Sequence, residues 1–216
     1  MKVGIFGTGD VGKALGRGFI ALGHEVRMGA REAGNPKAAA WVKDVGTKAS
    51  SGTFADAAKF GEIVVLATLG TATEEILRGV GPDSFKGKTV LDATNPLDFS
   101  TGAPKLIGNV GDSGGERHQK LLPGAHVVKV FNTVGNAFMF KPDFAGGPPD
   151  MFLCGNDDGA KKRAAAICKD FGWGVIDVGG IDTAHFLEAM CLVWVLSAMK
   201  TGGWNQAFKM LRKNEE

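Results

Sequence analysis

Near its N-terminus the chain has a glycine-rich turn between an apolar segment and a helical pattern, and this turn constrains the fold most strongly. The apolar residues Val3-Gly4-Ile5-Phe6 run into Gly7-Thr8-Gly9-Asp10-Val11-Gly12, where the glycines stand at Gly-x-Gly-x-x-Gly spacing. The first glycine allows a tight turn, the second a close backbone approach to a pyrophosphate, and the third close packing of helix on strand. We therefore predict a dinucleotide pocket that involves Gly7, Thr8, Gly9, Asp10, Val11 and Gly12.

The surroundings of these glycines strengthen the prediction. The chain contains 33 glycines among 216 residues, so the spacing can arise by chance, and a purely structural turn is the alternative. Apolar residues at helical spacing nevertheless follow the turn from Val11 to Leu22, and a second turn and strand follow within residues 23–29. This order of strand, turn, helix and strand favours a nucleotide site.

The residue that closes the second strand distinguishes NAD from NADP. A NAD-selective pocket carries Asp or Glu there, where the carboxylate binds the ribose 2′-hydroxyl. This chain has Gly29-Ala30-Arg31 instead, and the planar guanidinium of Arg31 suits a 2′-phosphate. Lys37 adds a second positive charge if the helix after Pro36 turns it inward. We therefore predict NADP(H), with NAD through Glu32 and a solvated Arg31 as the alternatives.

Composition and charge exclude several classes of function. The share of hydrophobic residues is 44% and that of charged residues 22%, which is ordinary for a globular protein. A net charge of +2, without a stripe of Lys and Arg, indicates no nucleic-acid partner. The three cysteines are widely spaced, so neither a disulfide framework nor a metal site is expected. The chain starts directly with a strand and shows no stretch of membrane-spanning length, so we expect no membrane partner and a cytoplasmic location.

Strands and helices alternate along the chain, which is typical of a parallel sheet covered on both faces. We expect an α/β fold over residues 1–182, a Rossmann-type doubly wound, mostly parallel sheet of about eight strands. Two of its helices are expected at Pro36 to Val45 and Thr53 to Phe60. The strands are expected at 3–6, within 23–29, and at 47–50, 62–68, 88–92, 126–132, 150–154 and 174–178.

In such sheets, ligands bind beyond the carboxyl ends of the strands, so the residues that follow each strand are the most informative. These residues are Thr68-Leu69-Gly70, Thr94-Asn95-Pro96 and Asn132-Thr133-Val134. We expect them to line the site. The alternative for Asn95 is a backbone role in an Asn-Pro turn, and the alternative for Asn132 is that of a strand-end cap.

Two further segments fall outside this alternation. Residues Phe99 to Glu116 are rich in glycine and are expected to form a long mobile loop, a candidate substrate lid. Residues 183–216 are expected to be helical, with a break at Thr201-Gly202-Gly203 before a second helix over Trp204 to Arg212. The first of these helices is apolar on nearly every side, so it must be buried or shared. Because aromatic and Met residues favour interfaces, we expect it to form a homodimer rather than to pack inside the monomer.

Five titratable residues stand out. Glu188 lies in the apolar helix and must find a partner or remain protonated, near the nicotinamide amide or at the dimer interface. Among the four histidines, His24 and His126 are expected to be structural or exposed. His118 and His185 could approach an acceptor, although a lone histidine is more often structural.

Six motifs spread over nearly the full length carry a resemblance to known proteins: residues 7–12, 29–31, 92–97, 128–132, 154–157 and 177–179. These motifs resemble the short NADP-dependent oxidoreductases of the coenzyme F420-dependent NADP reductase family. They also resemble the related cytosolic oxidoreductase domain of six-transmembrane ferric reductases. The stretch Lys129-Val130-Phe131-Asn132 is closer to the ferric-reductase domain, because the F420 enzymes typically have a histidine near this place. This sequence shows no counterpart of the haem-carrying membrane helices, so electron transfer across a membrane is not expected.

The resemblance implies hydride transfer between NADP(H) and a flavin or deazaflavin acceptor, namely F420, FMN or FAD, with ferric iron as a further electron acceptor. It places Thr8, Asp10 and Val11 at the pyrophosphate and Arg31 at the 2′-phosphate. Leu69 and Gly70 then belong to the adenosine side, and Asn95, Pro96, Asn132 and Thr133 to the nicotinamide and acceptor. Thr68 is expected to bind the cofactor as well. No acid or base is assigned, because stacking of the two rings supplies most of the rate.

Two other functions remain open at this point. One is an NADP-dependent dehydrogenase or reductase of a small organic substrate. The other is a non-enzymatic NADP-binding redox sensor.

The assignment of Arg31 predicts a change in cofactor selectivity. Arg31→Ala should weaken binding of NADPH much more than binding of NADH, by roughly 1.5–3 kcal/mol for each charge-assisted hydrogen bond lost. Calorimetric titration with both cofactors measures the difference. Equal losses for NADPH and NADH would show that Arg31 does not bind the 2′-phosphate.

Overall fold

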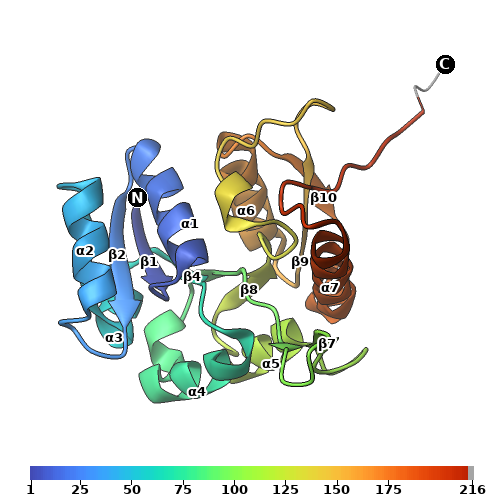
Figure 1. The fold of residues 1–216 in the computed structure, drawn as a ribbon. Coiled ribbons are helices and arrows are strands. Elements are labelled where there is room, and N and C mark those ends of the chain that lie inside the picture. The colour runs from blue at the N-terminus through green and yellow to red at the C-terminus, as the bar shows by residue number, and fades with distance from the viewer. Residues whose placement is uncertain (214–216) are drawn as a thin grey trace.

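An eight-stranded sheet lies at the centre of the structure, a computed structural model that describes residues 1–213 (Figure 1). The strands lie in the order β10-β9-β8-β5-β4-β1-β2-β3. Neighbouring strands are parallel except β8 and β9, which are antiparallel. The predicted mostly parallel, doubly wound sheet is therefore confirmed. Its strands are β1 (Lys2–Phe6), β2 (Glu25–Ala30), β3 (Ala49–Thr53), β4 (Ile63–Leu66), β5 (Thr89–Asp92), β8 (His126–Lys129), β9 (Asp150–Gly155) and β10 (Gly174–Asp177).

Helices cover both faces of this sheet (Figure 1). The α-helices of the described residues are α1 (Asp10–Ala21), α2 (Pro36–Val45), α3 (Phe54–Phe60), α4 (Gly70–Val80), α5 (Gly114–Leu121), α6 (Asp158–Asp170) and α7 (Ala184–Thr201). Three short 3-10 helices are η1 (Pro82–Phe85), η2 (Asn136–Phe138) and η3 (Ile181–Thr183), and a small hairpin consists of β6 (Leu97–Asp98) and β7 (Lys105–Leu106).

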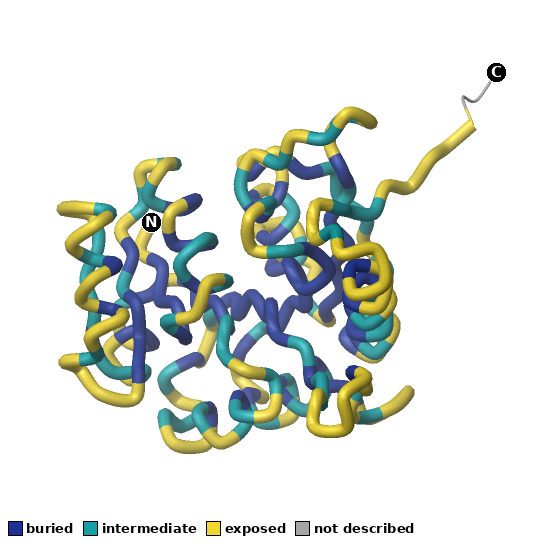
Figure 2. Tube along the Cα trace, in the orientation of Figure 1, coloured by how far each residue is buried: buried dark blue, intermediate teal, exposed yellow. Residues whose placement is uncertain are grey.

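The core divides into two layers, one on each face of the sheet. Side chains of α1, α2 and α6 pack on one face, and side chains of α3, α4, α5 and α7 pack on the other. Strands β4 and β5 are buried along their whole length, as Figure 2 shows by the dark blue centre of the molecule. A strand buried on both faces needs apolar residues in succession, and this explains the run Ile63-Val64-Val65-Leu66.

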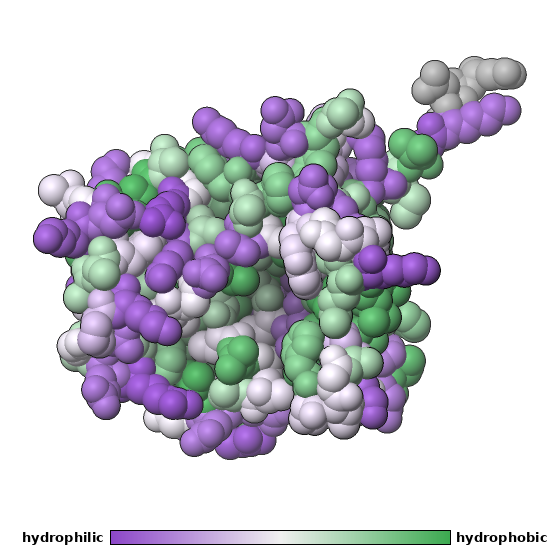
Figure 3. Space-filling view, viewed as in Figure 1, coloured by the Kyte–Doolittle hydropathy of each residue, from purple (hydrophilic) through white to green (hydrophobic). Residues whose placement is uncertain are grey.

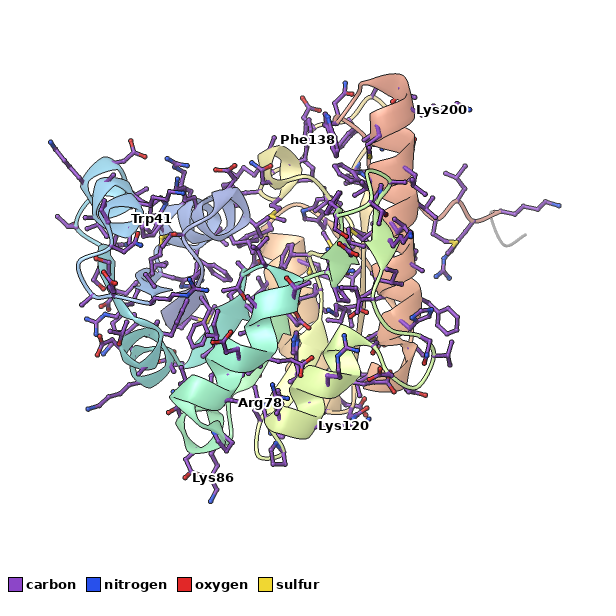
Figure 4. All side chains as sticks on the ribbon, turned by 60° about the horizontal axis from the view of Figure 1, so that its bottom comes forward. Trp41, Arg78, Lys86, Lys120, Phe138 and Lys200 are labelled. Atoms are coloured by element: carbon purple, nitrogen blue, oxygen red, sulfur yellow. The ribbon has the colours of Figure 1, made fainter. Side chains whose placement is uncertain are left out.

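Close packing of α1 on α2 depends on a helical glycine. A Cβ atom added at Gly16 would lie 2.6 Å from Cζ2 of Trp41. Trp41 is almost fully buried, and Figure 4 labels it between the two helices. The indole ring therefore occupies the space that a side chain at position 16 would need.

Several element boundaries differ from the sequence predictions. Strand β3 begins at Ala49 rather than Thr47, and β8 ends at Lys129 rather than Asn132. The predicted loop over Phe99 to Glu116 contains β7 and the first turn of α5, because Ser113 and Glu116 form a capping box. The loop is therefore shorter than predicted.

The predicted helix over Trp204 to Arg212 is wrong. Gly202 ends α7 in a left-handed conformation, with φ of 71°, and residues 203–213 are not helical. Their backbone instead bonds to the rest of the fold. The indole N–H of Trp194 donates to the carbonyl of Gln206 at 2.8 Å, and the amide of Asp150 donates to the carbonyl of Phe208 at 2.9 Å. Residues 214–216 of the predicted C-terminal segment lie outside the described residues.

Helix α7 is partly buried in the monomer. Leu187, Cys191 and Trp194 pack inward, whereas Phe186 and Val193 are more than half exposed. Within residues 1–213, the stretch 181–201 is long and apolar enough to cross a membrane, which corrects the expectation that no such stretch exists. The core helix of a globular protein can have the same length and composition, and α7 is partly buried in this fold.

The packing at Gly16 predicts a change in stability with an unusual sign. Alanine is the better helix former, yet Gly16→Ala should lower the free energy of unfolding by about 1–3 kcal/mol, because the methyl group collides with Trp41. Gly79→Ala is the matched control, since position 79 lies in α4 with no atom within 4 Å of an added Cβ. This control should raise stability by about 0.5–1 kcal/mol. Urea unfolding measures both, and a stabilised Gly16→Ala variant would contradict the packing argument.

Candidate active site

A cleft of about 600 Å³ opens where the strand order reverses, between β1 and β4. This is where a doubly wound sheet binds its ligand. Figure 3 views this side of the molecule and shows it hollowed near the centre. The predicted residues that line the cleft are Gly7, Thr8, Gly9, Asp10, Val11, Arg31, Thr68 and Leu69. Sequence reasoning missed Asn35, Phe54, Ala72, Ile76 and Asn136, whose places beside the cleft depend on how α2, α3, α4 and η2 pack.

The three glycines of the turn serve two different purposes. Gly7 has φ of +120°, and an added Cβ there would lie 2.3 Å from the carbonyl oxygen of Ala67. An added Cβ at Gly12 would lie 2.4 Å from the carbonyl oxygen of Gly7. At Gly9 an added Cβ would meet no protein atom within 4 Å. Packing therefore requires Gly7 and Gly12, whereas Gly9 leaves open space in the cleft, where a pyrophosphate fits.

Two helices begin at the cleft without a side-chain cap. The first residues of α1 and α4 follow Gly9 and Leu69, and neither receives a capping hydrogen bond from a side chain. By contrast, the side chains of Asn35, Thr53, Ser113 and Asp157 cap α2, α3, α5 and α6. Free N–H groups and the positive end of the helix dipole favour an anion at such a terminus. The residues present therefore fit the phosphates of a dinucleotide.

Arg31 lies at the end of β2, on the rim of the cleft, and is exposed. It forms no salt bridge within residues 1–213. Lys37 is also exposed but lines a neighbouring depression together with Lys13, Arg17 and Trp41. Arg31 is thus the cation of the cleft itself, and Lys37 lies beside it.

The ends of β5 and β8 bring Asn95 and Asn132 together. Asn132 Nδ2 donates to Asn95 Oδ1 and to the carbonyl oxygen of Leu187, each at 2.9 Å. Asn95 Nδ2 donates to the carbonyl oxygen of Asn132, also at 2.9 Å. Asn132 is 2% exposed, and its Oδ1 has no hydrogen-bond partner among residues 1–213. A buried acceptor without a donor costs about 1–3 kcal/mol.

Phe131, just before Asn132, has an unusual backbone conformation. Its φ is 60°, in the left-handed region that bulky residues rarely adopt. Such a conformation costs of the order of 1–3 kcal/mol and persists only where the surroundings enforce it. Here the Phe131 ring is buried 5.4 Å from the ring of Phe171, which in turn packs against Phe19 and Phe140.

A buried ionic cluster lies at the ends of β5 and β8, just before the two asparagines in the sequence. Lys129 Nζ contacts Asp92 Oδ2 at 2.8 Å, Glu188 Oε1 at 2.9 Å and the carbonyl oxygen of Thr94 at 2.9 Å. His118 Nδ1 lies 2.8 Å from the same Asp92 oxygen. Burial opposes ionisation of Asp92, but the charges of Lys129 and His118 outweigh it and hold the pKa of the carboxyl well below its ordinary value. Burial likewise opposes the charge of Lys129, and the two carboxylates nevertheless raise its pKa.

This cluster corrects the predicted surroundings of two residues. Glu188 accepts hydrogen bonds from the amides of Gly114 and Gly115 at the start of α5, so it is buried in the monomer rather than at the nicotinamide or a dimer interface. His118 is buried against Asp92 and does not approach the cleft. In the sequence only Glu188 stands out, as a carboxylate in an apolar helix, and no local pattern indicates its partners.

The cluster also fixes the backbone beside the cleft. Asp92 Oδ1 accepts from both the amide and the hydroxyl of Thr94, which precedes Asn95. An added Cβ at Gly70 would lie 2.1 Å from the carbonyl oxygen of Asn95, so α4 begins directly against this residue. Asn95 is therefore held from several sides. Thr133, by contrast, is buried behind Asn132.

The chain is similar in sequence to known NADP oxidoreductases. A family described as NADP oxidoreductase coenzyme F420-dependent matches residues 2–96. The F420-dependent NADP reductase of Methanothermobacter marburgensis is 28% identical over 200 residues, covering 87% of this chain and 88% of that protein. Metalloreductase STEAP3 of Rattus norvegicus is 26% identical over 191 residues, covering 88% of this chain but 36% of that protein.

A solved structure from Arthrobacter sp. FB24, provisionally described as an F420-dependent NADP reductase, extends the similarity over the whole fold. It is 37% identical, has a TM-score of 0.91, and the match covers 98% of this chain and 100% of that one. Together with the cleft and its glycine turn, this similarity shows that the chain belongs to the family of coenzyme F420-dependent NADP oxidoreductases.

Proposed function

We propose that this protein transfers hydride between NADP(H) and a flavin or deazaflavin acceptor. The open space at Gly9, in a cleft that ends at Arg31, is the observation that carries the proposal. A pyrophosphate needs the open space at Gly9, and the guanidinium of Arg31 suits a 2′-phosphate. The carboxyl ends of β5 and β8, which follow β4 in the sheet, then lie on the side of the nicotinamide.

Each part of the cleft has a role in this function. The free amides of α1 bind the pyrophosphate, and Arg31 binds the 2′-phosphate. The cofactor itself supplies the reactive hydride when it is bound. Apolar side chains such as Leu69 and Ile76 line the wall of the cleft. Positioning of two stacked rings provides most of the rate, so the site needs no side chain as acid or base.

F420 is the first candidate for the acceptor, because relatives over nearly the whole chain carry the name F420-dependent NADP reductase. FMN and FAD share the planar ring and are the second candidates. Ferric iron is the third, since the match to a metalloreductase suggests onward transfer of electrons. A small organic substrate, or a sensor without turnover, would replace this proposal if none of these acceptors reacts.

The proposal predicts acceptor-dependent oxidation of NADPH. Stopped-flow mixing with F420, FMN, FAD or a ferric chelate should show loss of NADPH absorbance with at least one acceptor. Gly9→Val should lower the rate at limiting NADPH at least tenfold without lowering the melting temperature, because its Cβ atom lies in the cleft, where it meets no atom of residues 1–213 within 4 Å. Tight binding of NADPH without oxidation by any acceptor would overturn the proposal and favour a sensor.

We also propose that the protein forms a homodimer through the outer face of α7. Four large apolar residues on this helix are between 45% and 57% exposed: Phe186, Val193, Leu196 and Met199. An apolar stripe of this kind on a surface helix favours association. A second copy is the partner expected, because the same stripe is then buried from both sides around a two-fold axis.

This interface predicts a dimer that one charge disrupts. Val193→Glu should convert a dimer into a monomer in light scattering coupled to size exclusion, because a carboxylate would be buried without a partner. Lys86→Glu, at an exposed position after η1 and far from α7, is the control and should remain dimeric (Figure 4). A monomeric native protein, or a dimeric Val193→Glu variant, would contradict the proposed interface.

A further inference from the structure

The hydrogen bonds between Asn95 and Asn132 allow only one orientation of each amide. Turning the amide of Asn132 would place its oxygen against Asn95 Oδ1 and the Leu187 carbonyl, both of which are acceptors. Turning the amide of Asn95 would place its oxygen against the Asn132 carbonyl. Each turn would exchange hydrogen bonds for contacts between like partial charges. The orientation of Asn95 is therefore determined by Asn132.

The two side chains differ in what they still offer to a ligand. Asn132 is buried, its Nδ2 is fully used, and its unpaired Oδ1 is not accessible. The fold thus leaves Asn132 Oδ1 unpaired, while Asn132 Nδ2 donates to Asn95 Oδ1 and to the Leu187 carbonyl. Asn95 is partly exposed, and after its bonds to Asn132 it retains one N–H and one oxygen lone pair. A free donor beside a free acceptor matches an amide.

The position of Asn95 identifies which amide this is. Arg31 at the end of β2 marks the adenosine end of the cleft, and the sheet continues from β1 through β4 to β5. Asn95 follows β5 and lies against Gly70, directly after the cleft residues Thr68 and Leu69. The nicotinamide, with its carboxamide, belongs at this end of the cleft.

The left-handed backbone at Phe131 explains how Asn132 reaches its position. Strand β8 ends at Lys129, whose side chain enters the ionic cluster, and three residues later the side chain of Asn132 must turn toward both Asn95 and α7. The change of direction occurs at Phe131, whose φ of 60° is held by the packing of its ring. A residue that retains such a conformation beside a site indicates a functional constraint.

We propose that Asn132 is a positioning residue, which holds the Asn95 amide so that it binds the carboxamide of the nicotinamide, and that the left-handed backbone at Phe131 is what places Asn132 there. This proposal rests on the proposed binding of NADP(H). In this proposal Asn95 contacts the cofactor. Asn132 and Phe131 do not contact it and act by setting the orientation of the Asn95 amide.

The test compares NADP⁺ with its acetylpyridine analogue, which has a methyl ketone in place of the carboxamide and so lacks the N–H donors. Calorimetry gives the Kd of each, and no electron acceptor is required. The native protein should bind the analogue about tenfold more weakly, the loss of one hydrogen bond. Asn95→Ala and Asn132→Asp should bind both compounds about equally. Asn132→Asp keeps the shape of the side chain and removes its donor.

Two sets of variants separate positioning from general destabilisation. Asn156→Ala removes an asparagine whose Oδ1 accepts from the amide of Ile181, remote from the cleft, and should keep the tenfold discrimination at a lowered melting temperature. Phe131→Gly and Phe131→Ala both lose the ring, but only glycine adopts the left-handed backbone without strain. Phe131→Gly should therefore retain more of the discrimination than Phe131→Ala.

Three results would overturn the proposal. They are a native protein that does not discriminate, an Asn95→Ala variant that still does, and an Asn132→Asp variant that keeps the native ratio. Failure of the native protein to bind NADP⁺ at all would be a different result, since it would refute the proposed function itself.

Discussion

The buried ammonium group of Lys129 is the interaction on which the arrangement of the site depends. A charge without water is costly unless carboxylates and hydrogen-bond acceptors surround it. Its partners are Asp92 at the end of β5, Glu188 in α7 and the backbone of Thr94. Glu188 also accepts from the first amides of α5. The cluster thus holds β5, β8, α5 and α7 in the one arrangement that satisfies it. Asn95 and Asn132 follow Asp92 and Lys129 by three residues each, so their positions depend on this arrangement.

Around this fixed centre the cleft leaves specific groups unsatisfied. The termini of α1 and α4 lack caps, Gly9 has no neighbour where a side chain would point, and Arg31 has no carboxylate partner within the described residues. Four other helices, α2, α3, α5 and α6, have side-chain caps, whereas α7, away from the cleft, has none. Unused donors that gather at one place are what an anionic ligand needs, and they explain why the cleft rather than another hollow is the candidate site.

Much of the fold could be predicted from local patterns. The run Ile63-Val64-Val65-Leu66 indicates a strand buried on both faces, and Asn35-Pro36 indicates the start of α2. The helix predicted over Trp204 to Arg212 failed because its backbone donors and acceptors bond to α7 and β9 instead. Local propensity cannot anticipate such contacts, which involve residues distant in sequence.

The sequence by itself determined the glycine turn, the cation at the end of β2 and the asparagines at two strand ends, because each belongs to a short motif whose conformation is local. Only the tertiary structure decided which glycine faces open space, since this depends on the carbonyl groups of Ala67 and Gly7. It also decided that Glu188 bonds to Lys129 and that Asn132 holds Asn95. These partners come from separate elements, and only the packing of the sheet and its helices brings them within hydrogen-bond distance.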